Sequence, residues 1–486
     1  MRNFYAFLFV LINIYSYGQR HTVTIVDGYI GGSFLAGDTV HVWAREMASD
    51  ETFSHWEGDV DVLEFPSEWY NAFIMPDHDV RLEAHFVKLP GQYELEYIQC
   101  AQSKKKVYHF MPKNPKGLVF LFHGTQGSAD GWIRNPSNFQ MFKDLMVAGY
   151  AVIVTEAEEV TLGEDTNMDG KIRWVTTSGQ QFNNIDIRNI ATLIDTFVTR
   201  GNIKEDIKKY AIGMSNGAAF SVTCSFGLSF DAAVPYCSSG NIVYINKTQT
   251  PTLWCMQEND DHPKVGIKGY NDARMFSDVL NQRGICSAVY LNNQTPIYPQ
   301  LFARAEGISV SKSQKIFEEL KSSGFMEFKN GYYYMKIFAD SIFTLVKANP
   351  RDYPQIVSLA SDMIKLLSVR SLMDVTHAGH KFFSFHNKRT LAFLSDPCSY
   401  ISASEQVEEP LQDAITVRPN PVSDRLWLEM VENYTFPRII SIYNSQGVLI
   451  KNVTVYDSNT ELNITGWPRG VYYLKVAGKT AKFIVQ

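Results

Sequence analysis

Short runs of apolar residues, separated by segments with helical periodicity, constrain the fold of this chain more strongly than any other sequence feature. Five runs occupy residues 117–122, 151–155, 210–213, 232–236 and 252–256. Strands that are apolar on both faces are typical of a parallel sheet covered by helices. One covering helix is predicted after Asp186, because Ile187, Ile190 and Leu193 fall on one stripe. We therefore expect an α/β fold for residues 91–398.

The 486 residues are enough for about three domains, and the pattern changes along the chain. Residues 19–90 alternate between apolar and polar positions, which predicts a small all-β module. The α/β pattern of residues 91–398 is interrupted at about residues 295–373 by amphipathic segments, which we interpret as a helical insertion forming a lid over a pocket. An acidic, turn-rich linker at residues 399–413 leads to a second all-β domain at residues 414–486.

The beginning of the chain has the pattern of a signal peptide. Arg2 precedes a short apolar run, and the small residues Ser16 and Gly18 predict a signal peptide of residues 1–18 that is cleaved after Gly18. No later segment reaches the length of about 18 apolar residues that spans a bilayer, so we expect no membrane span in the mature chain. Six cysteines in an exported chain could form disulfides, but the sequence alone fixes no pairing.

The charge of the chain argues against one class of partner. Lysine and arginine number 45 against 51 acidic residues, which gives a net charge of −6. A protein that binds nucleic acid usually presents a basic surface to the phosphate backbone. We therefore expect no nucleic-acid partner.

A candidate nucleophile follows the third predicted strand. The chain there reads Gly213-Met214-Ser215-Asn216-Gly217. A strand before and a predicted helix after this sequence are typical of a nucleophile elbow, in which a sharp turn exposes the serine hydroxyl and leaves room only for small flanking residues. Ser215 is therefore the candidate nucleophile.

Backbone N–H groups beside Ser215 could stabilise the oxyanion of an acyl-transfer reaction. We assign one donor to Asn216, directly after the nucleophile. The second donor is expected in the loop after the first predicted strand, which reads His123-Gly124-Thr125, and we choose Thr125. His123 itself is expected to hold that loop, since a general base at this position would precede the nucleophile in the chain.

The acid and the base of a catalytic triad are expected after the nucleophile, in the order Ser, Asp, His. The loop after the fifth predicted strand contains Asp260 and Asp261, and we choose Asp260 as the acid, with Asp261 as the alternative. Among the histidines further downstream we choose His380 as the general base, with His377 as the alternative.

The chain resembles the α/β-hydrolase superfamily, in the group of polyhydroxybutyrate depolymerase-like and feruloyl esterase-like esterases. The resemblance rests on the elbow, on the His123-Gly124 loop and on the acid and base named above. The resemblance implies an α/β-hydrolase fold and a serine carboxylic-ester hydrolase that requires no cofactor and acts on polysaccharide-linked or other environmental esters. The chain departs from the group by its insertion and by Met256-Gln257, where the family often has His-Gly. The alternatives are a serine peptidase on the same fold and a catalytically inactive, adhesive cell-surface protein.

The two flanking β regions each resemble a module of exported bacterial proteins. Residues 19–90 carry Trp56 and then Met75-Pro76-Asp77 in an order similar to divergent B-repeats, which implies an extracellular spacer or adhesive module. Residues 414–486 include Pro419-Asn420-Pro421 and Gly470-Val471-Tyr472-Tyr473-Leu474, and closely resemble the C-terminal sorting domain of the type IX secretion system. That resemblance implies handling by the type IX machinery, removal of the tail, and release or attachment at the cell surface.

Asp165, Asn167 and Asp169 have the spacing of the first half of a calcium-binding loop. Their side-chain oxygens could bind a structural Ca²⁺ ion. The twelfth position of such a loop is Thr176 instead of the usual bidentate glutamate, so a simple polar turn is the alternative.

Overall fold

The computed structural model describes residues 19–177, 183–262, 266–404, 415–419, 421–430, 438–444, 449–455, 457, 459–476 and 479–485. The predicted signal peptide and most of the predicted linker lie outside these residues. The chain divides into two compact units, Met1–Ile401 and Ser402–Gln486. Within the described residues, no helix combines the length and the apolar character needed to cross a bilayer.

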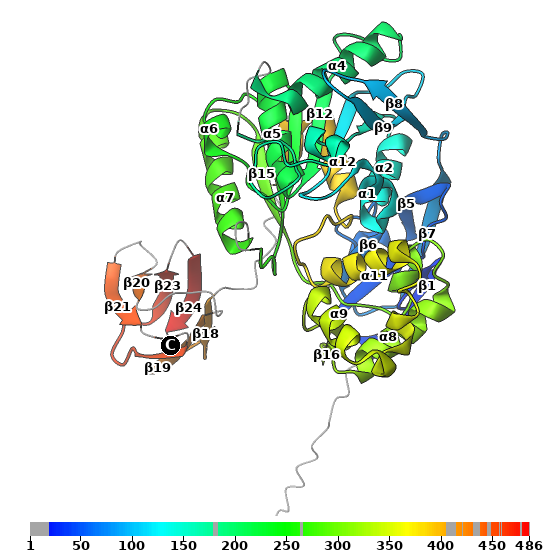
Figure 1. Cartoon of the computed structure of the whole chain (residues 1–486). Coiled ribbons are helices and arrows are strands. Elements are labelled where there is room, and N and C mark those ends of the chain that lie inside the picture. The colour runs from blue at the N-terminus through cyan, green and yellow to red at the C-terminus, as the bar shows by residue number, and fades with distance from the viewer. Residues whose placement is uncertain are drawn as a thin grey trace, which may run out of the picture. The chain divides into compact units, whose positions relative to one another are not determined.

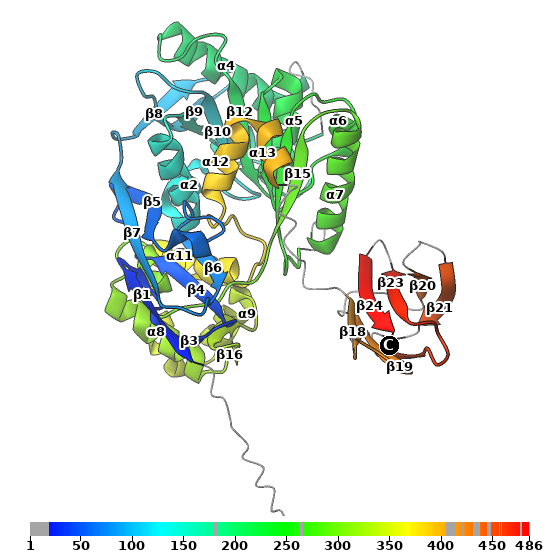
Figure 2. The same ribbon diagram turned by 180° about the vertical axis from the view of Figure 1, so that it is seen from behind.

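The first unit is built around an eight-stranded mixed sheet, seen from two sides in Figure 1 and Figure 2. Its strands, in spatial order, are β15(Ser287–Asn292), β14(Thr252–Gln257), β13(Ala232–Tyr236), β12(Lys209–Met214), β10(Leu118–Phe122), β11(Ala151–Val154), β9(Lys104–Phe110) and β8(Glu94–Gln99). The first six strands of this order run parallel to their neighbours, whereas β9 and β8 pair antiparallel. The five predicted strands form β10 to β14, which confirms the α/β class.

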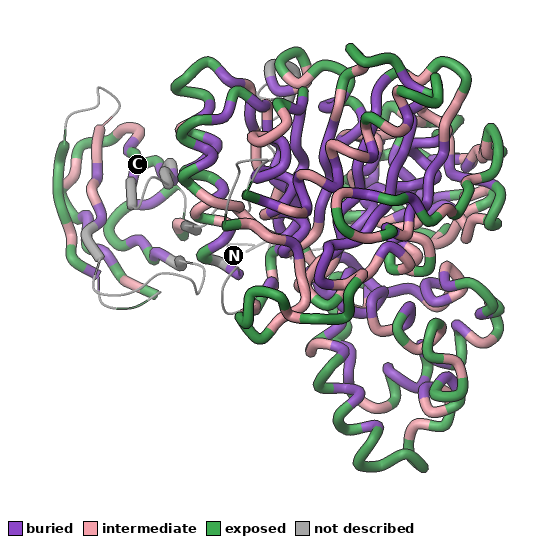
Figure 3. The backbone as a smooth tube through the Cα atoms, turned by 45° about the horizontal axis from the view of Figure 1, so that its top comes forward, coloured by how far each residue is buried: buried purple, intermediate pink, exposed green. Residues whose placement is uncertain are grey.

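Side chains that alternate along the strands face two layers of helices. Leu121 of β10 shares a core with Phe142 of α2, and its neighbour Phe120 shares the opposite core with Phe197 of α4. The helices of this part are α1(Ala129–Arg134), α2(Pro136–Val147), α3(Glu158–Leu162), α4(Ile185–Thr199), α5(Asn216–Leu228), α6(Ile242–Ile245), α7(Gly266–Gln282) and α12(Asn387–Ser395). The central strands are accordingly buried along most of their length (Figure 3).

Residues 20–88 form two small sheets that pack within the same unit. One sheet has the order β3(Gly32–Leu35), β1(Arg20–Val26), β7(Val80–Lys88) and β5(Glu51–Gly58), and the other has β2(Gly28–Tyr29), β4(Thr39–Ala44) and β6(Tyr70–Ile74). Trp69 donates its indole N–H to the carbonyl oxygen of Ser384, and Thr52 donates its hydroxyl to Asp144 of α2 (2.9 and 2.6 Å). The division of this unit into a β module and a hydrolase domain stays a prediction.

The insertion is mainly helical, as expected, but it also contains a hairpin. Its elements are η3(Leu301–Arg304), α8(Val310–Ser322), β16(Met326–Lys329), β17(Tyr332–Met335), α9(Ala339–Ala348), η4(Pro350–Asp352), α10(Pro354–Val357) and α11(Met363–Thr376). The N-terminal strands lie beside helices α8, α9 and α11 in both views (Figure 1, Figure 2), and Tyr332 accepts a hydrogen bond from the backbone N–H of His41. The role of the insertion as a lid stays a prediction.

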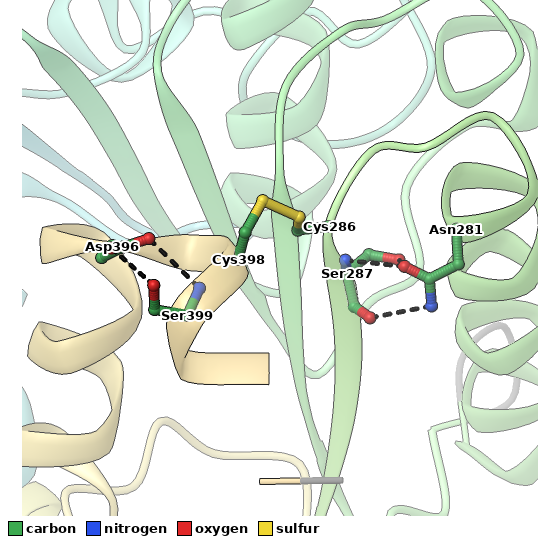
Figure 4. Close-up of a disulfide and its surroundings, with 6 residues drawn as sticks. All are labelled: Asn281, Cys286, Ser287, Asp396, Cys398 and Ser399. Carbon is green, nitrogen blue, oxygen red and sulfur yellow. Dashed lines mark hydrogen bonds between the residues drawn. A yellow bond between two sulfur atoms is a disulfide. The ribbon is translucent and has the colours of Figure 1, made fainter. Parts of the chain in front are cut away.

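One disulfide ties the end of the first unit to the sheet (Figure 4). Cys286 lies directly before β15, and Cys398 lies in α13(Pro397–Ser404). The ring of Tyr400 in the same helix packs against the ring of Tyr290 in β15. The helix that precedes the C-terminal unit is therefore fixed to the edge strand of the sheet.

The second unit contains two antiparallel sheets around its own apolar core. One sheet consists of β18(Ile415–Arg418), β19(Arg425–Met430) and β22(Asn459–Asn463), and the other of β21(Leu449–Val455), β20(Arg438–Asn444), β23(Gly470–Val476) and β24(Lys479–Val485). Leu428, Ile440 and Phe483 are among the buried residues of this core. The unit is all-β.

Candidate active site

Ser215 lies on a tight turn between β12 and α5, with φ 58° and ψ −116°. A Cβ on Gly213 would lie 2.0 Å from the carbonyl oxygen of Gly217, and a Cβ on Gly217 would lie 2.3 Å from the carbonyl oxygen of His123. Both flanking positions therefore accept only glycine. This geometry is that of a nucleophile elbow at the carboxyl end of a parallel strand.

His380 links Ser215 to Asp260. Its Nε2 lies 2.8 Å from the hydroxyl oxygen of Ser215, and its Nδ1 lies 2.8 Å from Oδ2 of Asp260. With its proton on Nδ1, the imidazole donates to the carboxylate and presents Nε2 as an acceptor to the serine hydroxyl, which is the arrangement that a general base needs. We refer to these three side chains as the Ser–His–Asp row.

The structure places neither of the two alternative residues, Asp261 and His377, in the Ser–His–Asp row. Asp261 is exposed, whereas the side chain of Asp260 is 1% exposed. His377 lies at the end of α11, where its Nδ1 lies 3.0 Å from the carbonyl oxygen of Met335. Neither Asp261 nor His377 has a hydrogen bond with a member of the row among the described residues.

Hydrogen bonds hold the loop of Asp260 against the loop of His380. Asn259 donates its backbone N–H to the carbonyl oxygen of Ala378 and its side-chain amide to that of His377 (3.0 and 2.8 Å). Gln257 donates its side-chain amide to the carbonyl oxygen of Lys381. The two loops, which are far apart in the sequence, therefore keep a fixed separation.

His262 is a neighbour of the row that sequence reasoning missed. Its ring is stacked on the ring of His380, and its backbone N–H donates to Oδ1 of Asp260 (3.0 Å). Burial and the adjacent His380 lower the pKa of His262. The only sequence signal was its position two residues after the acid.

The loop after β10 lies beside Ser215. A Cβ on Gly124 would lie 3.4 Å from the Cβ of Ser215. Burial lowers the pKa of His123 to about 4, and this neutral ring accepts a hydrogen bond from the backbone N–H of Ala157. His123 therefore holds the loop. No hydrogen bond between described residues uses the backbone N–H of Thr125, which leaves this group for a ligand.

Trp174 connects the two sides of the elbow. Its backbone N–H donates to the side-chain oxygen of Asn216 (2.9 Å), and its indole N–H donates to the carbonyl oxygen of His123 (2.9 Å). These contacts occupy the side chain of Asn216 and leave its backbone N–H at the first position of α5. No local pattern in the sequence indicates this role of Trp174.

The proposed calcium ligands lie in a turn that uses their oxygens. Asp165 accepts hydrogen bonds from the backbone N–H groups of Asp169 and Gly170, and Asp169 forms an ion pair with Arg173. Asn167 also accepts from the N–H of Asp169. These contacts suit a polar turn and occupy part of the oxygen set, so a bound Ca²⁺ stays a prediction.

A cavity of about 280 Å³ lies elsewhere in the first unit. It is lined by loops of the N-terminal region, by α1 and α2 and by the insertion, with Trp69, Lys143 and Arg304 in its wall. None of the three residues of the row lines it. Lys143 and Arg304 are both engaged there with backbone carbonyl oxygens of the N-terminal strands, so we assign this cavity no role in the chemistry.

Residues 416–486 match the family model described as a secretion system C-terminal sorting domain. The second unit is a secretion sorting domain. It indicates that the protein is secreted or attached to the cell surface, as the sequence predicted. The predicted likeness of residues 19–90 to B-repeats stays a prediction.

One curated protein and several solved structures are similar to parts of the chain. Beta-agarase A from Zobellia galactanivorans is 31% identical over 80 residues, which are 16% of this chain and 15% of that protein. The chain thus spans only about 15% of the length of this relative.

Several of the similar solved structures are named as hydrolases or esterases, and their sequence identity to this chain is low. Dienelactone hydrolase from Anabaena variabilis is 16% identical, with 48% of this chain and 96% of that chain covered and a TM-score of 0.32. An esterase from Pyrobaculum calidifontis is 11% identical over 49% and 87% of the two chains (TM-score 0.31), and Est1E from Butyrivibrio proteoclasticus, solved with ferulic acid, is 14% identical over 48% and 100% (TM-score 0.29). The α/β-hydrolase fold of this chain follows from its strand order and its elbow.

Proposed function

We propose that the protein is a secreted serine carboxylic-ester hydrolase. The observation that carries the proposal is the Ser–His–Asp row, in which His380 lies 2.8 Å from both the Ser215 hydroxyl and the Asp260 carboxylate. A buried carboxylate, a correctly oriented imidazole and a hydroxyl on a strained turn are the parts that nucleophilic acyl transfer requires.

In the proposed reaction, the Ser215 oxygen attacks the ester carbonyl while His380 accepts the hydroxyl proton at Nε2. The backbone N–H groups of Thr125 and Asn216 stabilise the resulting oxyanion. His380 then donates its proton to the leaving alcohol, which leaves an acyl group on Ser215. A water molecule, deprotonated by His380, releases the acid and restores the serine.

The sorting domain supports a substrate outside the cell, because it indicates secretion or surface attachment. We therefore propose polysaccharide-linked or other environmental esters as substrates. The row alone does not distinguish an ester from an amide bond, since both pass through a tetrahedral oxyanion. A serine peptidase is accordingly the second candidate.

Hydrolysis of p-nitrophenyl acetate by the full chain tests the proposal. Ser215→Ala should lower kcat by about 10⁴- to 10⁶-fold, and Asp260→Asn by about 10⁴-fold, because the imidazole loses its orienting partner. Asp261→Asn, which alters the exposed neighbour, is the matched control and should keep full activity. Equal losses in the two Asp→Asn variants, or unchanged turnover in Ser215→Ala, would reject the assignment.

Two further measurements separate the alternatives. A fluorophosphonate probe should label Ser215 in the unaltered protein, whereas an inactive adhesive protein would stay unlabelled. A panel of acetylated xylan, feruloylated sugars, polyhydroxybutyrate and peptides then identifies the bond that is cleaved. If only the peptides are cleaved, the protein would be a serine peptidase and the ester assignment would be wrong.

A further inference from the structure

We propose that Glu94, Glu96 and His109 bind a divalent transition-metal ion of the zinc type at the outer edge of the central sheet. Glu94 and Glu96 lie on β8, the last strand of the sheet, and His109 lies on its antiparallel neighbour β9, directly opposite Glu94 in the strand register. Helix α4 lies close to this hairpin in both views (Figure 1, Figure 2). The site is separate from the Ser–His–Asp row.

His109 provides the first observation. The residue is only 6% exposed, and its Nε2 is buried without a hydrogen-bond partner in the described part of the chain. A buried ring nitrogen usually finds a partner, because leaving it unsatisfied costs free energy. The ring packs edge-on against Phe197 of α4, with centroids 5.0 Å apart, so its direction is set by packing.

The distances provide the second observation. The nearest ligand atoms of Glu94, Glu96 and His109 all lie within 4.8 Å of one another. Nε2 of His109 lies 3.6 Å from Oε1 of Glu96, which is too long for a hydrogen bond. Two ligand atoms on one tetrahedral zinc ion are roughly 3.4 Å apart, since each bond is about 2.0–2.1 Å long. The 3.6 Å separation of Nε2 and Oε1 is close to the spacing that a shared ion would impose.

The type of ion follows from the donor atoms. One imidazole nitrogen and two carboxylates suit Zn²⁺, whereas Ca²⁺ and Mg²⁺ prefer oxygen ligands alone. Three protein ligands leave a fourth position for water.

Arg200, which follows α4, orients one of the ligands. Its guanidinium donates to Oε2 of Glu96 at 2.8 Å, which leaves Oε1 directed toward His109. Contacts of this kind from outside a metal site commonly fix the direction of a ligand. Two carboxylates and one guanidinium also leave one net negative charge, which favours a cation.

The bound ion would join the edge strand β8 to β9. Its expected effect is on stability, because none of the three ligands takes part in the row. Saturating Zn²⁺ should raise the Tm of the full chain by about 2–4 °C or more, since the ion binds the folded state preferentially.

The test measures Zn²⁺ stoichiometry by titration calorimetry and Co²⁺ coordination by visible absorption on the full chain. A second cluster could add to the measured Zn²⁺ stoichiometry, because Cys237, Asp260 and His380 also place ligand atoms within 4.8 Å of one another. The decisive quantity is therefore the difference between variants. Glu94→Gln and His109→Phe should each lose one equivalent of metal and the associated Tm rise.

Glu205→Gln is the matched control, since it makes the same charge change as Glu94→Gln at another exposed position. This control should keep the full stoichiometry, and ester hydrolysis in the absence of added metal should be unchanged in Glu94→Gln. His109→Phe preserves a ring against Phe197, and Glu94→Gln alters only an exposed side chain, so both variants should fold. Equal stoichiometry in Glu94→Gln and Glu205→Gln, or no binding by the unaltered chain, would overturn the proposal.

Discussion

The imidazole of His262 is stacked on that of His380, with ring centroids 4.5 Å apart and 23° between the planes. The same loop supplies Asp260, whose carboxylate accepts the backbone N–H of His262. The ring of His262 therefore supports His380 from one face without occupying either of its ring nitrogens.

A permanent positive charge at position 262 should weaken His380 as a general base. Asp260, Asp261 and Lys171 are among the charged groups that act on this position. In His262→Lys, the added charge lies beside the imidazolium that forms when His380 accepts the Ser215 proton, so kcat/KM for p-nitrophenyl acetate should fall. His262→Phe keeps a flat ring and serves as the control, with a kcat/KM close to that of the unaltered chain. An equal kcat/KM in both variants would contradict this electrostatic coupling.

Replacing Gly217 should destabilise the elbow. The Cβ of Gly217→Ala would lie 2.3 and 2.4 Å from two backbone carbonyl oxygens, which cannot move without disturbing β10. We expect a loss of at least about 2 kcal/mol in the free energy of unfolding. Gly131→Ala, in α1, meets no atom within 4 Å and should gain up to about 1 kcal/mol. Urea unfolding measures both, and similar stabilities would contradict the steric argument.

The stability of the first unit should depend on pH through Glu68. Glu68 is 1% exposed, and this burial raises the pKa of its carboxyl group to about 7. The folded chain therefore holds a proton that the unfolded chain has lost, so this residue makes stability fall as pH rises from 4.5 to 7. The loss amounts to about 3 kcal/mol.

Glu68→Gln tests this dependence, because a neutral amide can still accept the backbone N–H of Arg389. The variant should gain about 3 kcal/mol relative to the unaltered chain between these two pH values. Denaturant unfolding at several pH values gives the difference directly. Parallel stability curves for the two proteins would show that the carboxyl of Glu68 titrates normally.

Removing the disulfide should destabilise the first unit. The bond between Cys286 and Cys398 closes a loop across a sequence separation of 112 residues. Cys398→Ala should lower the free energy of unfolding by about 3–5 kcal/mol, chiefly because the unfolded chain gains freedom. A reducing agent should lower the stability of the unaltered protein to that of the variant and leave the variant unchanged. Equal stabilities before reduction would contradict the presence of the bond.

The residues of the row could be predicted because their signals are local. The strand–serine–helix context identifies the position of Ser215, and the parallel sheet fixes which loops can reach it. Asp260 and Asp261 stand side by side in the sequence, so only burial in the folded loop distinguishes them. Likewise, the choice between His377 and His380 depends on where helix α11 ends in the folded chain.

The features that escaped prediction depend on contacts between distant segments. Trp69 meets Ser384 across 315 residues, and no local pattern at either residue indicates the partner. Trp174 lies in a segment with no helical or strand periodicity, although it holds both sides of the elbow. The hairpin of β16 and β17 interrupts a region where the helical stripes dominated the pattern.

The attachment of α13 to β15 has a consequence for maturation. If the sorting domain is removed after export, the new chain end follows this helix, and chain ends tend to be poorly ordered unless they are tied down. The bond at Cys398 and the ring contact of Tyr400 hold the helix in place on the sheet. The chain end left by such a removal would therefore stay anchored beside the edge strand β15.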